Sequence, residues 1–360
     1  MKESRLLEDI RGQERSLAKV LAWQRGEGLG ALLEAGRRLR GARKIVVTGI
    51  GASLHAAFPL QYELAAKGFE CSIVECGELL HYQERVCAGA AVLVVSRSGE
   101  SVEIVKLLGR LKGIAEHTIG VTNEASSALA RGADLALMVG SLADEMVAVQ
   151  SYTGTVAALL LLAGVVGGAL EQRREELDRA LAELSTLVEA QISGASEWDS
   201  FFRVGSPVHF LGRGPSYASA LEGALLFCET AKEPAVGLAA GSFRHGPVEI
   251  VDSNFRAIVF AWWGRTRELN LGLAGDLVRF GGTVRVVGPA GSDIGSLPFI
   301  EVPAVSEWIA PLMEIVPVQV AALRLAERKG LEIGKFRYAP QVTRDEMKFS
   351  RPEDKRVRTG

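Results

Sequence analysis

The 360-residue sequence has little net charge and few cysteines. Lysine and arginine number 41 and aspartate and glutamate 43, so the formal charge is −2. This near-neutral balance provides no overall basic field, and we therefore expect neither nucleic acid nor an anionic membrane as a partner. The four cysteines are Cys71, Cys76, Cys87 and Cys228, and they form no CxxC motif and have no histidine at zinc spacing. We therefore expect reduced thiols in a reducing compartment. A metal site formed by Cys71 and Cys76 is the less favoured alternative.

The sequence also lacks a long hydrophobic run. The longest, residues 156–170, falls short of a membrane span and is typical of a buried core helix. The first five residues are largely charged or polar and are not followed by an apolar stretch, so we expect no signal peptide and a cytoplasmic location. With 48% hydrophobic and 23% charged residues, the composition is that of a globular protein long enough for two domains.

The hydrophobic pattern predicts an α/β fold. Residues 4–40 have apolar positions at helical spacing and predict two amphipathic helices. A helix is also predicted from about residue 53 to 67. Short apolar runs then alternate with helical segments, which favours a doubly wound parallel sheet. The strands expected in this part of the chain are residues 45–47, 71–75, 91–95, 118–122 and 135–139.

The same order recurs in the second half. Residues 48–57, TGIGASLHAA, align without gaps to residues 211–220, LGRGPSYASA. An apolar strand follows about 45 residues later in each copy, at 92–95 and 257–261. Such a repeat predicts two tandem doubly wound domains with helices on both faces of each sheet. The predicted division is N-terminal helices over 1–40, a first domain over 41–170, a helical connection over 171–200, a second domain over 201–348 and a polar tail over 349–360.

A serine-rich loop follows the third predicted strand. Residues 96–101, SRSGES, bring hydroxyls and free backbone N–H groups to a helix start, which is the environment that a phosphate monoester needs. Gly99 would let the backbone approach the anion closely. Serine also caps helices routinely, so an N-cap followed by a turn is the alternative. The position at the carboxyl edge of a parallel strand favours a phosphate site.

A glycine loop follows the first predicted strand. Gly49 and Gly51 precede Ser53 at a strand-to-helix junction, but the dinucleotide motif would place a third glycine where Leu54 stands. Glu75, at the end of the second predicted strand, could contact a ribose. A nicotinamide-dependent oxidoreductase therefore stays open as a minor alternative.

Four segments together resemble the sugar isomerase (SIS) fold: IGASLHAA, SRSGESVEIVKLL, LGRGPSYASALEGALLFCE and AAGSFRHGP. They are most similar to the isomerase half of the glutamine–fructose-6-phosphate aminotransferases, over about residues 5 to 346. The N-terminal glutaminase domain of that family has no counterpart in this sequence, so no glutaminase activity is expected. The resemblance implies a sugar-phosphate site whose phosphate and sugar contacts are Ser53, Ser96, Arg97, Ser98, Ser101, Gln150 and Ser151. Arg97 stands where the family has glutamine, and would add positive charge beside a phosphate.

The resemblance also implies a set of catalytic residues in the second half. Glu229 matches the general base that moves a proton between C1 and C2 of the open-chain sugar. Glu222, two helical turns earlier, matches a second carboxylate, although paired glutamates on a helix are often solvated. His245, in FRHGP, matches a histidine that assists ring opening and comes from the neighbouring subunit, so a homodimer is implied. Three of the other histidines are expected to be structural: His55, His81 and His117.

Two departures bear on the reaction. Leu226 stands where the family's helix has lysine, and Pro340 or Gln341 stands where a C-terminal lysine forms a Schiff base with the ketose. Lys335 and Lys348 are nearby in sequence but at the wrong spacing. The second copy also has no serine cluster, because residues 263–268 read WGRTRE.

We therefore expect a phosphosugar isomerase, amino-sugar-phosphate deaminase or deglycase that works through an enediol-like intermediate without a metal or redox cofactor. The identity of the sugar phosphate stays open. A non-catalytic phosphosugar sensor is the first alternative, since the missing lysine would suit binding without turnover.

Overall fold

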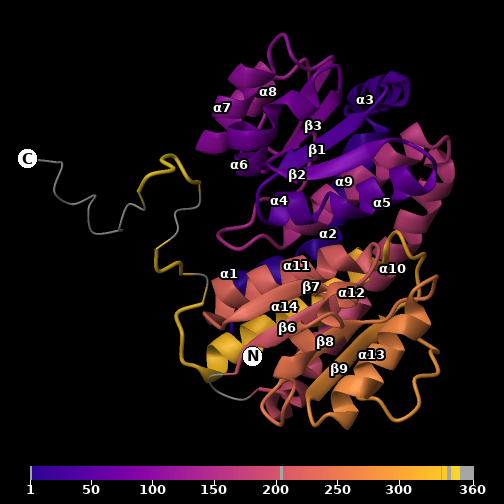
Figure 1. The fold of residues 1–360 in the computed structure, drawn as a ribbon, viewed down its shortest axis with the longest axis vertical. Coiled ribbons are helices and arrows are strands. Elements are labelled where there is room, and N and C mark those ends of the chain that lie inside the picture. Colours follow the sequence, from indigo (N-terminus) through magenta and orange to yellow (C-terminus); the bar gives the residue numbers. More distant parts are fainter. Residues whose placement is uncertain (1, 203–205, 334, 339–341, 349–360) are drawn as a thin grey trace, which may run out of the picture.

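Two parallel β-sheets, one in each half of the chain, carry the fold (Figure 1). The structure is a computed structural model that describes residues 2–202, 206–333, 335–338 and 342–348. The predicted tail over residues 349–360 lies outside these ranges. The first sheet consists of β1 Ile45–Gly49, β2 Cys71–Glu75, β3 Ala91–Val95, β4 His117–Thr122 and β5 Leu135–Met138. The second consists of β6 Val208–Gly212, β7 Ala235–Ala239, β8 Arg256–Phe260, β9 Thr283–Pro289 and β10 Phe299–Val302.

The two sheets have the same topology. The strand order is β2-β1-β3-β4-β5 in the first sheet and, in the corresponding direction, β7-β6-β8-β9-β10 in the second. All strand pairs are parallel. The predicted α/β class with two tandem doubly wound sheets is thereby confirmed. In this order the chain reverses its winding beside β1 in one sheet and β6 in the other, which is where open α/β sheets bind ligands.

Helices cover both faces of each sheet. The first half has α1 Arg5–Arg11, α2 Gln13–Arg25, α3 Leu29–Gly41, α4 Ala52–His55, α5 Phe58–Ala66, α6 Cys76–Glu78, the π-helix η1 Leu79–Gln83, the 3-10 helix η2 Glu84–Cys87, α7 Val102–Leu111, α8 Ala128–Gly132 and α9 Gln150–Val166. The remainder has α10 Leu170–Ser193, η3 Ala195–Ser200, α11 Ser216–Leu226, the π-helix η4 Phe227–Ala231, α12 Ala240–Phe243, η5 Pro247–Ile250, α13 Arg267–Arg279 and α14 Ala310–Arg328. Within the described ranges, no helix is both long and apolar enough to span a membrane.

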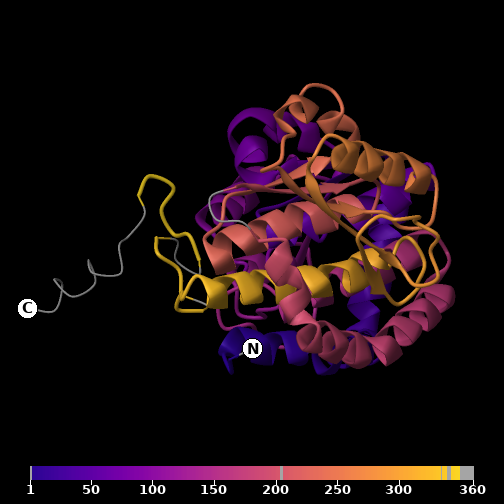
Figure 2. The same cartoon turned by 90° about the horizontal axis from the view of Figure 1, so that it is seen from below.

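The two halves share their largest hydrophobic core. A single cluster of buried side chains runs from α1 and α2 through α9 to α14. Figure 2 shows α14 crossing the molecule with α10 alongside it, and these two helices are in contact. Separate, smaller clusters lie under α7 in the first half and under α13 in the second. The inner helices therefore bury apolar surface from both sheets, which fixes the halves relative to each other.

Two segments of the chain contain more, and shorter, helices than predicted. Residues 4–40 form three helices rather than two, because Gly12 separates α1 from α2 and lies against the side chain of Gln150, where a Cβ would come within 2.6 Å of Oε1. The helix predicted from residue 53 to 67 is interrupted between α4 and α5, and Pro59 stands in the first turn of α5. Most of the apolar run at 156–170 forms a buried helix as predicted, but this helix, α9, ends at Val166.

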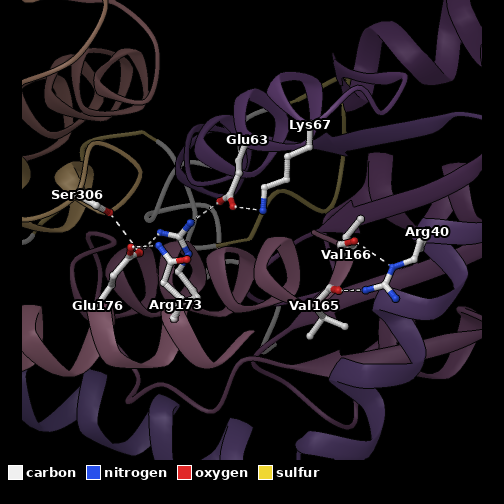
Figure 3. A network of polar contacts seen from close by, with 9 residues as sticks. Arg40, Glu63, Lys67, Val165, Val166, Arg173, Glu176 and Ser306 are labelled. Atoms are coloured by element: carbon white, nitrogen blue, oxygen red, sulfur yellow. Dashed lines mark hydrogen bonds and ion pairs between the residues drawn. The ribbon is translucent and has the colours of Figure 1, made fainter. Parts of the chain in front are cut away.

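A buried ion-pair network helps to join the halves (Figure 3). Arg173 on α10 donates to Glu63 on α5 at 2.9 Å and to Glu176 at 2.6 Å. Glu176 also accepts from Ser306 at 3.3 Å, in the loop that leads into α14. Lys67 pairs with the other oxygen of Glu63 at 3.1 Å. Because Arg173 and Glu63 are almost fully buried, their charges depend on each other and on this geometry.

Candidate active site between the two halves

The serine-rich loop connects β3 to α7 and has a closely defined backbone. Ser96 Oγ accepts from the N–H of Gly99 at 3.1 Å, and Ser98 Oγ accepts from the N–H of Glu100 at 3.3 Å. Gly99 has φ 62°, and a Cβ there would lie 2.4 Å from Oγ of Ser127. Glycine is therefore required both by the backbone conformation and by the close approach of the next loop.

The glycine loop after β1 lies beside this serine-rich loop. The backbone N–H of Arg97 donates to Ser53 Oγ at 3.3 Å, which joins the two loops. Gly51 has φ 53°, and a Cβ there would contact Leu225 of α11 at 3.6 Å. Since β1 and β3 are neighbours at the point where the winding reverses, the loops meet at the carboxyl edge favoured for ligands. Glu75, considered above as a ribose contact, instead accepts from the N–H of Glu78 at 3.0 Å at the start of α6.

A cavity of about 320 Å³ opens at this edge and is lined by residues from both halves. The predicted side chains that line it are Ser53, Ser96, Arg97, Ser98, Ser101, Ser151 and Glu229. The other lining residues are Ile50, Gly51, Ala52, Ile104, Met146, Ala148, Tyr152, Thr155, Leu225, Phe336 and Thr343. One end of the cavity thus has hydroxyls and a guanidinium, and a carboxylate enters from the second half.

Glu229 reaches the cavity from the π-helix η4. Burial, together with repulsion from Glu222, raises the pKa of its carboxyl to about 7, against the opposing effects of Arg97 and Lys232. A carboxyl with a pKa near neutrality can both accept and release a proton at physiological pH. π-helices are rare and are frequently found at functional sites, and this one directly follows α11.

Glu222 is buried but does not line the cavity. Its Oε2 lies 2.9 Å from Nδ1 of His55, which belongs to α4 of the first half. The side chain of Glu222 is 1% exposed, and burial raises the pKa of its carboxyl, while the hydrogen bond to His55 lowers it. The alternative of a solvated glutamate is therefore wrong, and His55 has a specific partner that no motif indicated. Only the fold brings the two residues together.

The loop before α9 holds one predicted residue in the cavity and turns another away. Asp144 accepts from the backbone N–H groups of Gln150 at 2.7 Å and Ser151 at 2.9 Å, and from the hydroxyl of Ser151. Ser151 thereby faces the cavity at a helix start. The side chain of Gln150 points to Asp9 instead, with Nε2 donating to Oδ1 at 3.1 Å, so it does not line the cavity.

Tyr152 lines the cavity and is not marked by any sequence motif. The residue is 2% exposed, and its hydroxyl has no hydrogen-bond partner among the described residues. A buried hydroxyl without a partner costs free energy, so it is a candidate to bond a ligand atom. Its position directly after Ser151 was the one available signal.

His245 lies apart from the cavity of its own chain. It follows α12 in the second half, is exposed, and is absent from the cavity lining. Its backbone N–H donates to the carbonyl of Ser242 at 3.1 Å, which closes a turn. Any contact of this histidine with a ligand in such a cavity would have to come from another copy of the chain.

A C-terminal segment runs from the second half back over the first. Phe336 and Thr343 line the cavity, and the carbonyl of Thr343 accepts from the N–H of Val102 at 3.0 Å, in the first turn of α7. Glu346 then pairs with His81 at 3.0 Å and with Lys106. Pro340 and Gln341, where the resemblance would place a lysine, lie outside the described residues.

Fold and cavity together define a class of protein: a tandem doubly wound α/β protein with a hydroxyl-rich pocket at the switch point of its first sheet. The chain belongs to the SIS domain family, which matches it over residues 38–164 and 206–326. This confirms the family to which the sequence motifs pointed.

Curated proteins that are similar in sequence include glutamine–fructose-6-phosphate aminotransferases. Glutamine–fructose-6-phosphate aminotransferase (isomerizing) of Pyrococcus horikoshii is 29% identical over 305 residues, covering 80% of this chain and 49% of that protein. The Arabidopsis thaliana protein of the same name, numbered 1, is 29% identical over 336 residues, covering 89% and 48%. The chain thus spans about half the length of the curated relatives it matches.

Solved structures share the fold. The C-terminal domain of glucosamine-fructose-6-phosphate aminotransferase from Francisella tularensis superposes with a TM-score of 0.80 at 21% identity, covering 92% of this chain and 98% of that one. Glucosamine-6-phosphate deaminase from Thermotoga maritima gives 0.75 at 21% identity, covering 94% and 99%.

Proposed function

We propose that this chain binds a phosphorylated sugar or amino sugar and catalyses its isomerisation, deamination or deglycation through an enediol-like intermediate. The observation that carries the proposal is the shared cavity, in which the serine-rich loop of the first half faces Glu229 of the second. The names of the similar proteins support a sugar-phosphate substrate, since they include a fructose-6-phosphate aminotransferase and a glucosamine-6-phosphate deaminase.

The phosphate would bind at the start of α7. Ser53, Ser96, Ser98 and Ser101 would supply neutral donors, and the helix N-terminus adds partial positive charge. Arg97 would neutralise part of the phosphate charge and strengthen the hydrogen bonds to it. The far end of the sugar would then extend toward Glu229, Ser151 and the buried hydroxyl of Tyr152.

Glu229 would transfer the proton between adjacent carbons of the open-chain sugar. The carboxylate form is the base, and its pKa lies at about 7, so turnover should fall as the pH drops below that value and the group becomes protonated. Glu222 would keep this pKa high by like-charge repulsion.

A homodimer would complete the site. His245 is exposed and outside the cavity of its own chain, so we propose that it acts on the sugar bound to a second copy. The same observation favours the alternative of a phosphosugar sensor if the chain does not dimerise, because a lone copy has a binding pocket and a base but no histidine in it.

The test is to titrate fructose 6-phosphate and glucosamine 6-phosphate by calorimetry and to measure their turnover. Glu229→Gln should keep the affinity but lower turnover by at least about 100-fold, because a general base contributes rate factors of this order. Mixing inactive Glu229→Gln with inactive His245→Asn should restore part of the turnover if the histidine acts across a dimer. Binding without turnover in the wild type would favour the sensor, and failure of both sugar phosphates to bind would contradict the proposal.

A further inference from the structure

Among the described residues, two charged side chains line the cavity, and neither is paired with another. They are Arg97, in the serine-rich loop, and Glu229, in the π-helix η4. No hydrogen bond or ion pair joins the guanidinium of Arg97 or the carboxyl of Glu229 to any described side chain. Charges in a partly enclosed cavity are screened less than charges on the surface. A ligand that enters the cavity therefore meets one cation and one titratable carboxyl that influence each other.

The backbone of Arg97 is held by three hydrogen bonds. Its N–H donates to Ser53 Oγ at 3.3 Å, and its carbonyl accepts from Thr122 Oγ1 at 3.0 Å and from the N–H of Asn123 at 3.1 Å. These bonds join the serine-rich loop to the glycine loop after β1 and to the end of β4. The point from which the guanidinium extends is thereby fixed, and the side chain can adjust to an anion beside the serines.

The charged groups around Glu229 come from several elements. Burial and repulsion from Glu222 of α11 raise the pKa of Glu229 to about 7, against the opposing effects of Arg97 and Lys232. The amine of Lys232 donates to the main-chain carbonyl of Glu229, not to its carboxyl, and the charge of Arg337 in the C-terminal segment acts on this amine. The charged side chains of α14, which also packs against η4, have partners of their own: Glu314 with Ser216 and Ser219, Arg324 and Arg328 with Asp199, and Glu327 with Arg324.

A bound sugar phosphate would change this balance. A phosphate monoester carries a charge of about −1.5 to −2 at neutral pH. Like the charge of Glu222, it would repel the carboxylate form of Glu229 and favour the protonated form. A protonated glutamate cannot accept a proton from the sugar, so the ligand would itself weaken the base unless its charge is offset. A guanidinium beside the phosphate supplies that offset.

We propose that Arg97 acts through Glu229: by pairing with the bound phosphate, it keeps the carboxyl of Glu229 ionised in the complex and the base active near neutral pH. This inference rests on the proposed function and adds to phosphate binding an effect on the group that transfers the proton. Arg97 is in this sense a positioning residue, since it forms and breaks no bond of the sugar. Glutamine, which the resemblance places at this position, would bond the phosphate without offsetting its charge.

The experiment measures the pKa of Glu229 in the full chain by nuclear magnetic resonance. Glutamate is isotopically labelled at its side-chain carboxyl carbon, the resonances are followed against pH with and without saturating fructose 6-phosphate, and Glu229 is identified by the resonance lost in Glu229→Gln. In Arg97→Gln, the pKa of Glu229 in the complex should be higher than in the wild type by at least about 0.5, because a nearby positive charge has been removed.

Two further variants separate charge from phosphate contact. Arg97→Lys keeps the charge, so the pKa of Glu229 in the complex should stay within about 0.2 of the wild-type value, even if the phosphate is bound less tightly. Arg85→Gln is the matched control, because Arg85 is an exposed arginine of the same half that does not line the cavity. It should leave both the affinity for fructose 6-phosphate and the pKa of Glu229 unchanged.

Turnover gives a second readout. The low-pH limb of kcat at saturating fructose 6-phosphate should move to higher pH in Arg97→Gln by the same amount, since kcat reports the pKa of the base in the complex. If fructose 6-phosphate binds but the pKa of Glu229 in the complex is the same in Arg97→Gln and the wild type, the inference is overturned and the proposed function stands. If neither fructose 6-phosphate nor glucosamine 6-phosphate binds the wild type, both are overturned.

Discussion

The loop from β3 to α7 and the loop from β8 to α13 occupy corresponding places in the two halves but have different side chains. Each has six residues, at 96–101 and 261–266, between the end of the strand and the start of the helix. Each has glycine at its fourth position with positive φ, 62° at Gly99 and 134° at Gly264. A hydroxyl residue, serine or threonine, ends both. The two halves therefore share the length of this loop and the position of its glycine, while the backbone at that glycine differs.

The side chains decide what the turn can bind. Where the first loop has serines around the cavity, the second has Trp262, which is buried and donates to the carbonyl of Val305 at 3.0 Å, and Trp263, which is 42% exposed. An acidic group also lies against the second turn: a Cβ on Gly264 would come 2.5 Å from Oε2 of Glu307. Indole rings stand where the first loop has an arginine and a serine, and a carboxylate lies against the turn, although Arg265 and Thr266 remain as potential donors.

The largest effect is expected when Ser98 of the first loop is replaced by tryptophan, the residue that stands at the same position, 263, of the second loop. Ser98→Trp puts an indole into a cavity of about 320 Å³ and removes a hydroxyl. Hydrogen bonds to charged groups contribute about 1.5–3 kcal/mol each, so losing that of Ser98 should weaken fructose 6-phosphate binding at least about 10-fold, and the bulk of the indole should weaken it further. Calorimetric titration measures this loss, and circular dichroism checks that the fold is intact.

Ser126→Trp is the matched control, because Ser126 is an exposed serine of the same half that does not line the cavity. It should bind the ligand as the wild type does. Unchanged binding by Ser98→Trp would mean that the phosphate binds elsewhere, and the contrast between the two loops would lose its functional meaning.

The sequence pattern predicted those features of the first loop that depend only on residues close together in the chain. Strands β1 and β3 are β-branched apolar runs buried on both faces, and the serine-rich loop follows directly from where β3 ends. The interruption between α4 and α5 was missed, because each side of it has acceptable helix formers. The pairing of His55 with Glu222 could not be predicted, since it joins residues 167 positions apart. Tyr152 was missed because an unpartnered hydroxyl is a property of packing.

A second contrast concerns the helices that follow the glycine loops. In the second half, Ser216 and Ser219 donate to the buried carboxylate of Glu314 at 2.6 and 2.7 Å, so that helix start is satisfied within its own half. In the first half, His55 instead reaches Glu222 across the junction. The polar partner of the first helix start therefore lies across the junction between the halves, whereas that of the second lies within its own half. The second helix start meets the first half through Tyr217, whose ring centroid lies 5.1 Å from that of Phe58.

His55→Gln should break that contact with an intermediate effect. Glu222 would lose its hydrogen bond with the imidazole while staying buried, and an unsatisfied buried acceptor costs about 1–3 kcal/mol. The free energy of unfolding, measured with urea, should fall by this amount. Glu222→Gln alone removes the charge of the carboxylate. In that background, His55→Gln should therefore lower the free energy of unfolding by less than it does in the wild type. Additive losses in the two single variants would contradict an interaction between them.

The smallest expected effect comes from the reverse exchange, Trp263→Ser in the second loop. The residue is partly exposed, so the free energy of unfolding should change by no more than about 0.5 kcal/mol. The new hydroxyl should not create a second phosphate site, because the carboxylate of Glu307 already lies against the backbone of this turn and would repel a phosphate. Calorimetry should still give one fructose 6-phosphate per chain. If it gave two, side-chain hydroxyls alone would be enough to turn this loop into an anion site, and Glu307 would have no part in keeping the second half empty.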